Sequence, residues 1–149
     1  MAADLEVRDL YSKLLNAWNT KDAAAYSELF SDDGTIVGFD GTSMQTPGAI
    51  LEHLSSIFAD HDPAAYVCRI VEVRALGATA MLLRAHAGMV PPGGSDIAAD
   101  RNAVQVLIAV DTPNGWRIAH FHNTPATFDG RPEEVEELTN ELQALVGPA

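Results

Sequence analysis

Cysteine is nearly absent from this chain of 149 residues, which holds only Cys68. A lone cysteine excludes an internal disulfide framework and favours a reducing compartment, so we expect a cytoplasmic protein. Long apolar runs are missing as well, and none approaches the ~20 residues that a membrane helix requires. The charged N-terminal segment lacks the apolar stretch of a signal peptide.

Basic residues are also scarce. The chain has 9 Lys and Arg residues against 21 Asp and Glu residues, which gives a formal net charge of -12. Nucleic acids and anionic membranes both attract basic surfaces. We therefore expect neither nucleic acid nor a membrane as a partner.

Apolar residues are plentiful, at 47% of the chain against 20% charged, so the chain is expected to fold around one core as a single domain, residues 1–149. Apolar residues recur at helical spacing over residues 7–18, which predicts an amphipathic helix. Residues 19–22, ending in Asp22, break this helix and can cap the next one, which is expected over 23–30. Thr46 is expected to be the N-cap, and Pro47 the first residue, of a third helix that runs through Phe58. Between them, residues 31–34 predict a turn, and Asp40-Gly41 predicts a hairpin between two short strands.

The second half of the chain has the two-residue period of β-strands. Strands are expected over residues 66–75, 79–89, 102–111 and 116–128, with a Pro/Gly loop at 90–95 and a last helix beginning near Pro132. Short connections between long strands predict a mainly antiparallel sheet of about six strands in an α+β fold. Such a sheet, curved around helices, forms a cone whose hollow is a candidate ligand cavity.

Several local motifs occur in an order that is similar to one superfamily. They are AWNTKD at 17–22, LFSDDG at 29–34, GFDG at 38–41, PPGG at 91–94, RNAVQ at 101–105 and GWRIAHFHNTP at 115–125. Together they resemble the nuclear-transport-factor-2-like, or SnoaL-like, proteins, and within these the SgcJ/EcaC family. The match is close to members found in gene clusters for nine-membered enediyne antibiotics.

The resemblance implies a cone-shaped sheet wrapped around helices, commonly in a homodimer formed through the sheet. It implies a cavity for a hydrophobic, polyene- or polyketide-like small molecule. It does not by itself imply a reaction, because the superfamily includes isomerases, dehydratases, cyclases and proteins without known catalysis.

Three histidines are the candidate catalytic residues: His120, His122 and His86. Strict alternation places His120 and His122 on one strand face with Trp116 and Ile118, where imidazoles can act as acid and base near neutral pH. The alternative is that both are satisfied core or interface histidines. The position of a β-bulge decides which face lines the cavity, and the sequence does not place one.

No metal or cofactor is expected. Two histidines two residues apart can bind a metal, but no third ligand follows at a suitable spacing. The PPGG segment lacks the spacing of a phosphate or dinucleotide loop.

Seven residues are candidate ligand contacts. Arg84 is suited to orienting a carbonyl or enolate oxygen, although an exposed or interface face explains it equally well. Gln105 lies in an apolar strand and needs a partner or a ligand if buried. The full set is Trp18, Phe39, His53, Arg84, Arg101, Gln105 and Asn123.

Three functional hypotheses follow. The first is a tailoring enzyme that isomerises, cyclises or hydrates an apolar intermediate without a cofactor. The second is a binding protein that shields such an intermediate from water without chemistry of its own. The third is an assembly module, as in kinase hub domains of the same fold.

Overall fold

The computed structural model describes residues 2–147. Its elements are α1 (Ala2–Asn19), α2 (Ala23–Glu28), β1 (Phe30–Val37), β2 (Ser43–Gln45), α3 (Pro47–Asp60), β3 (Ala65–Ala75), β4 (Ala80–Val90), a 3₁₀ turn (Ala99–Arg101), β5 (Ala103–Thr112), β6 (Gly115–Pro125) and α4 (Pro132–Gln143). Within the described residues, none of these helices is long and apolar enough to cross a membrane.

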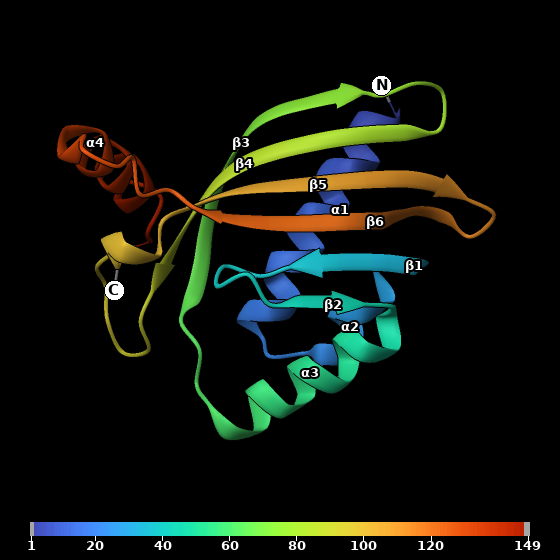
Figure 1. Ribbon diagram of the computed structural model, residues 1–149, viewed down its shortest axis with the longest axis horizontal. Coiled ribbons are helices and arrows are strands. Elements are labelled where there is room, and N and C mark those ends of the chain that lie inside the picture. Colours follow the sequence, from blue (N-terminus) through green and yellow to red (C-terminus); the bar gives the residue numbers. More distant parts are fainter. Residues whose placement is uncertain (1, 148–149) are drawn as a thin grey trace.

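The six strands form one sheet in the order β2-β1-β6-β5-β4-β3. All neighbouring strands are antiparallel except β1 and β6, which run parallel. The sheet curves strongly, and β3 bends along its length as it follows β4 (Figure 1). The predicted α+β fold with a curved, mainly antiparallel sheet of six strands is confirmed.

Helix α1 crosses the concave face of the sheet, while α2 and α3 lie together beside β1 and β2 (Figure 1). The helical spacing of the apolar residues in α1 explains this placement, because it gathers them on one side of the helix. Val7, Tyr11 and Leu14 on that side are completely buried. The main core therefore lies between α1 and the concave face.

Helix α4 packs at one end of the opposite, outer face of the sheet, away from the other helices (Figure 1). Its Leu138 and Leu142 are buried with Ile97 and Ala126 in a second, smaller apolar cluster. Two apolar cores thus lie on opposite faces of the sheet, and the smaller one is independent of the hollow of the cone.

Both short-range capping predictions correspond to hydrogen bonds. The Asp22 side chain accepts from the backbone N–H of Ala25 at the start of α2. Thr46 caps α3 by accepting from the N–H of Ala49, with Pro47 in the first turn. These caps fix where the two helices begin.

The predicted turn over residues 31–34 is wrong, since these residues belong to β1, and α2 ends at Glu28 rather than at Phe30. Phe30 pairs with Ile118 on β6, and the pairing then shifts before Thr35. Turn-forming residues occupy an irregular stretch of strand here because Phe30 before them and Thr35 after them both pair with β6. A Cβ atom at Gly34 would lie 3.0 Å from the Ile118 carbonyl oxygen, so glycine permits the close approach.

A β-bulge divides β6 at Ala119. Ile108 pairs with His120, and the next residue of β5, Ala109, pairs with Ile118. Ala119 therefore has no pairing partner on β5. The extra residue reverses the alternation of side chains along β6. Ile118 and Phe121, three residues apart, are consequently both buried in the main core.

Candidate functional site

A cavity of about 680 Å³ opens between the concave face of the sheet, the end of α1, α3 and the β1–β2 hairpin. Most of its lining is apolar or aromatic. The lining residues are Trp18, Tyr26, Ile36, Gly38, Phe39, Asp40, Thr42, Met44, His53, Leu54, Ile57, Pro63, Ala64, Tyr66, Met89, Pro91, Ala98, Asp100, Arg101, Ala103, Phe121 and Asn123. Its volume is within the range of about 300–1,000 Å³ that is typical of small-molecule sites.

Five of the seven predicted ligand contacts line this cavity: Trp18, Phe39, His53, Arg101 and Asn123. They come from α1, the β1–β2 hairpin, α3, the 3₁₀ turn that precedes β5, and strand β6. The fold therefore brings together residues that are far apart in the sequence. The other two predicted contacts do not line it. Gln105 lies directly behind Asn123, and Arg84 pairs with Glu72 at 3.1 Å on the outer face of the sheet.

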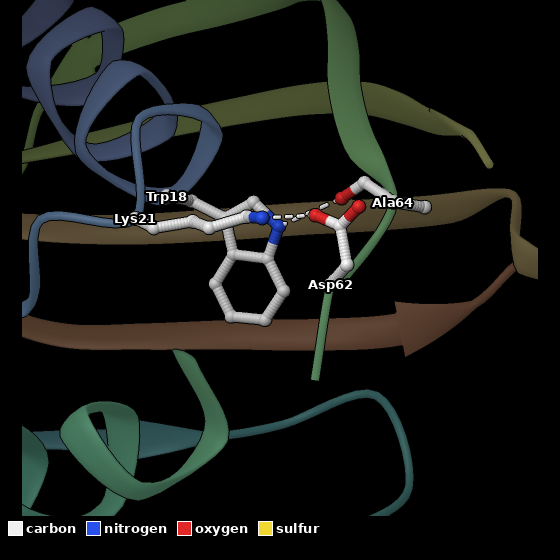
Figure 2. Close-up of polar contacts among 4 residues, drawn as sticks. All are labelled: Trp18, Lys21, Asp62 and Ala64. Atoms are coloured by element: carbon white, nitrogen blue, oxygen red, sulfur yellow. Dashed lines mark hydrogen bonds and ion pairs between the residues drawn. The ribbon is translucent and has the colours of Figure 1, made fainter. Parts of the chain in front are cut away.

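Trp18 forms one wall of the cavity and is held from several sides. Its indole Nε1–H donates to the carbonyl oxygen of Ala64 at 2.9 Å, just before β3 (Figure 2). Beside it, Lys21 forms an ion pair with Asp62 and ties the same two segments together (Figure 2). The Phe58 ring packs edge-on at a centroid distance of 5.4 Å. These contacts fix the indole as a rigid aromatic surface.

The inner end of the cavity carries polar side chains. The amide of Asn123, which is only 9% exposed, lies 3.5 Å from the hydroxyl of Tyr66. Behind it, Gln105 donates to the Asn123 side-chain oxygen at 2.9 Å and accepts from the hydroxyl of Tyr11 at 2.6 Å. Gln105 is completely buried, so these partners satisfy both ends of its amide.

The mouth of the cavity carries charged groups. The Arg101 guanidinium lies 5.3 Å from the centre of the Phe39 ring, a cation–π contact. Hydrogen bonds from Thr42, with the neighbouring His53 contributing, hold the pKa of the Asp40 carboxyl below its usual value. Asp40 therefore remains a carboxylate at neutral pH.

Burial controls the protonation of the tyrosines around the cavity. It raises the pKa of Tyr11 and of Tyr26 far above the ordinary phenol value. Burial also raises the pKa of Tyr66, although the Asn123 hydrogen bond and the charge of Arg101 oppose it. All three phenols therefore keep their protons near neutral pH. Burial likewise raises the pKa of the Cys68 thiol, which makes it a poor nucleophile.

The three predicted catalytic histidines lie away from this cavity, on the outer face of the sheet. The expectation that His120 and His122 share a face with Trp116 and Ile118 is wrong, because the bulge at Ala119 reverses the alternation between them. His86, on β4, faces α4, and its Nδ1 lies 3.5 Å from a Glu141 carboxylate oxygen.

His120 and His122 form a small polar cluster on that outer face. His120 Nδ1 lies 2.7 Å from the Thr35 hydroxyl, and its Nε2 lies 3.1 Å from His122 Nδ1. Burial of the imidazole lowers the pKa of His120 below its usual value, and the neighbouring His122 lowers it further. The pair is thus placed for mutual hydrogen bonding rather than for proton transfer in the cavity.

Within residues 2–147, no group of three or more His, Cys, Asp or Glu side chains is placed to hold a metal ion. The polar groups around the cavity instead come as single side chains on separate elements, with apolar groups between them. Such an arrangement suits recognition of an organic molecule through a few hydrogen bonds.

Sequence reasoning missed the tyrosines. Tyr66 is the most important of them, since it lines the cavity and contacts Asn123. The two-residue period around Tyr66 predicts a strand, but it does not mark this tyrosine as a ligand contact. Its role depends on Asn19, whose side chain accepts from the Tyr66 N–H at 2.8 Å and donates to its carbonyl oxygen at 3.1 Å. Such a contact between α1 and β3 is invisible in the local sequence.

A curved sheet that encloses a cavity with helices is the architecture of one class of protein domain, and comparison with protein families agrees with it. Residues 7–127 match the family of SnoaL-like domains. The chain therefore belongs to the SnoaL-like domain family. It has no significant match among curated protein sequences.

Solved structures share the fold at low sequence identity. A domain of unknown function with a cystatin-like fold from Nostoc punctiforme is 19% identical, with a TM-score of 0.81, covering 92% of this chain and 86% of its own. A nuclear-transport-factor-2-like protein of unknown function from Pseudomonas putida is 14% identical, with a TM-score of 0.67, covering 83% and 86%. A ketosteroid isomerase-like protein from Erwinia carotovora is 17% identical, with a TM-score of 0.63, covering 80% and 93%. These likenesses establish the nuclear-transport-factor-2-like fold.

Proposed function

We propose that this protein binds a hydrophobic, polyene- or polyketide-like intermediate in the cavity of its cone, as an accessory protein of antibiotic biosynthesis. The observation that carries the proposal is the cavity itself, with aromatic walls from Trp18 and Phe121 and a few polar groups at its two ends. Transfer of a conjugated apolar molecule from water into such a site is favourable, because it removes apolar surface from water.

The sequence motifs support a more particular setting for this proposal. Their resemblance to SgcJ/EcaC proteins of nine-membered enediyne clusters favours an enediyne intermediate as the guest. Polyene intermediates are reactive, and an enclosed apolar cavity shields them from water. We propose a cytoplasmic location, where reducing conditions suit the single half-buried thiol of Cys68.

Binding without catalysis is favoured over enzymatic turnover by the position of the histidines. The imidazoles of His120, His122 and His86 lie on the outer face, so they do not reach a molecule in the cavity. His53, next to Asp40 at the mouth, is the histidine placed for proton transfer to a bound molecule. Cofactor-free isomerisation, cyclisation or hydration through His53 is the second candidate function.

Diphenylhexatriene, a conjugated hydrocarbon that fluoresces only in apolar surroundings, tests the binding proposal directly. We expect saturable fluorescence with one probe bound per chain. Ala103 faces the cavity from β5 and is 1% exposed, so Ala103→Leu fills part of the cavity and should weaken binding. Ala78→Leu makes the same substitution in the exposed turn between β3 and β4, away from the cavity, and serves as the matched control.

The outcomes of this titration are distinct. Absent probe fluorescence with the wild type, or equal binding by the folded Ala103→Leu and Ala78→Leu variants, contradicts a ligand site in the cone. The catalytic alternative is tested by incubating a candidate polyene intermediate with the purified protein. Product formation that His53→Ala abolishes would establish an enzyme, and binding without product supports a carrier.

We also propose that two copies associate through the outer face of the sheet, as the family resemblance implies. Val106 and Ile108 are only half-buried there, beside His120 and His122 on β6. Apolar groups of this kind gain from mutual burial between two sheets. Light scattering at micromolar concentration should give twice the 15.9 kDa chain mass, and Ile108→Glu should reduce it to one chain. A wild-type species of one chain mass contradicts the dimer.

A further inference from the structure

Four polar side chains form a hydrogen-bonded chain from the core to the cavity. Tyr11 and Gln105 are completely buried, and Asn123 is nearly so, while Tyr66 reaches the cavity wall. The distances along the chain are 2.6 Å from Tyr11 to Gln105, 2.9 Å from Gln105 to Asn123 and 3.5 Å from Asn123 to Tyr66. We call these four residues the polar relay.

The relay has a direction. The Tyr11 hydroxyl donates to the Gln105 side-chain oxygen, so the amide nitrogen of Gln105 points the other way and donates to the Asn123 oxygen. The nitrogen of Asn123 in turn faces the Tyr66 hydroxyl oxygen. Because an amide has one accepting end and one donating end, the orientation of each side chain fixes that of the next.

The direction of the relay determines what it offers to a ligand. The Tyr66 oxygen accepts from Asn123, so its own O–H is left to donate, and within residues 2–147 it has no protein acceptor. The Asn123 nitrogen also carries a second N–H. The half-buried phenol keeps its proton, since partial burial raises the pKa of Tyr66. Arg101, at the same cavity, carries only donors as well.

We propose that Tyr66 and Asn123 bind a hydrogen-bond-accepting oxygen, a carbonyl, on an otherwise apolar ligand, and that Tyr11 and Gln105 are positioning residues that hold the two donors toward it. This inference rests on the proposed function, because it assumes that the cavity takes an apolar guest. A neutral carbonyl suits the site better than a carboxylate, since the two carboxylates of Asp40 and Asp100 outnumber the single guanidinium of Arg101 in the cavity lining.

The test compares two probes of similar size in the same protein. Diphenylhexatriene has no oxygen, and dibenzylideneacetone carries one ketone between its two phenyl-vinyl arms. Direct fluorescence gives the affinity for the hydrocarbon, and competition gives that for the ketone. The readout is the ratio of the two affinities, in which a general loss of binding cancels. Tyr66→Phe should lower the ketone-to-hydrocarbon ratio about tenfold, as expected for one lost hydrogen bond. Ala78→Leu, in the exposed β3–β4 turn, should leave the ratio unchanged.

The infrared carbonyl stretch of the bound ketone tests the positioning role. In the wild type we expect it at lower wavenumber than in an alkane solvent, because hydrogen bonding weakens the C=O bond. Tyr66→Phe should move it back toward the alkane value. Gln105→Leu and Tyr11→Phe leave Tyr66 and Asn123 themselves unchanged but remove contacts that orient the Asn123 amide. Both variants should therefore also move the stretch toward the alkane value.

Each outcome separates this inference from the proposed function. A wild type that fails to bind diphenylhexatriene contradicts the proposed function. Normal hydrocarbon binding with an unchanged ratio in Tyr66→Phe overturns the carbonyl site alone, and indicates a relay that runs in reverse, with the Tyr66 proton used on Asn123. A wild-type carbonyl stretch in both Gln105→Leu and Tyr11→Phe overturns their positioning role.

Discussion

The Leu142 side chain of α4 lies so close to Gly88 of β4 that a Cβ atom at Gly88 would be 2.9 Å from Leu142 Cδ1. Leu142 is completely buried, and the same added Cβ atom would lie 3.2 Å from Ile97 Cδ1. The absence of a side chain at Gly88 therefore allows α4 to dock on the outer face of the sheet.

Replacing Gly88 should loosen this docking. Gly88→Ala is expected to lower the free energy of unfolding by about 1–3 kcal/mol, because the added methyl group displaces Leu142 from a packed site. Urea unfolding measures the change. Gly48→Ala is the matched control, since Gly48 lies near the start of α3 with nothing within 4 Å of an added Cβ atom, and alanine should stabilise that helix by up to about 1 kcal/mol. A neutral Gly88→Ala would contradict the tight contact.

The Gln105–Asn123 pair should show energetic coupling. Gln105→Leu leaves the Asn123 oxygen and the Tyr11 hydroxyl without their buried partner, so we expect a loss of about 1–3 kcal/mol in unfolding free energy. Asn123→Leu on its own should also destabilise the protein. The double variant should cost less than the sum of the single ones, by about 0.5–3 kcal/mol in a double-mutant cycle. Additive effects would show that the two amides do not depend on each other.

Stability should fall with acidification because of His120. Its pKa is held below the ordinary value of about 6.5 in the folded protein, so the unfolded chain takes up a proton first as the pH drops. The unfolding free energy should therefore decrease from the ordinary histidine pKa down to the folded one. His120→Gln should flatten the profile in that window. NMR titration of the imidazole checks the cause, and a folded pKa at or above the ordinary value would refute it.

Asn19 should control the order of the Tyr66 backbone. Its side chain bonds both the N–H and the carbonyl oxygen of Tyr66, at 2.8 and 3.1 Å. Asn19→Ala removes both bonds, so hydrogen exchange at the Tyr66 amide should accelerate about tenfold, which corresponds to ~1.4 kcal/mol. Asn16→Ala makes the same substitution at an exposed position one turn earlier in α1 and should leave that amide unchanged. Equal exchange rates in the two variants would contradict the anchoring role.

Much of the fold could be predicted from local chemistry. The apolar spacing of α1, the caps at Asp22 and Thr46 and the two-residue period of β3 to β6 each depend on neighbouring residues, and each predicts its element. The turn predicted over residues 31–34 is wrong because Phe30 and Thr35, on either side of them, pair with β6, which lies far away in the sequence.

The candidate site was predictable only in part. Trp18, Phe39, His53, Arg101 and Asn123 line the cavity because the order of elements places their segments around the hollow of the cone. The positions of His120 and His122 depended on one unpaired residue in β6, and the role of Tyr66 depended on contacts with α1 and β6. Register shifts and long-range side-chain contacts of this kind leave no periodic trace in a single sequence.

The unpaired Ala119 decides which side chains of the last strand face the cavity side of the sheet. Removing that one residue would force half of β6 to exchange its two sides, either turning Trp116 and Ile118 to the outer face or turning the imidazoles of His120 and His122 to the cavity side. A length change of a single codon in this strand thus decides whether apolar side chains or imidazoles of β6 face the cavity.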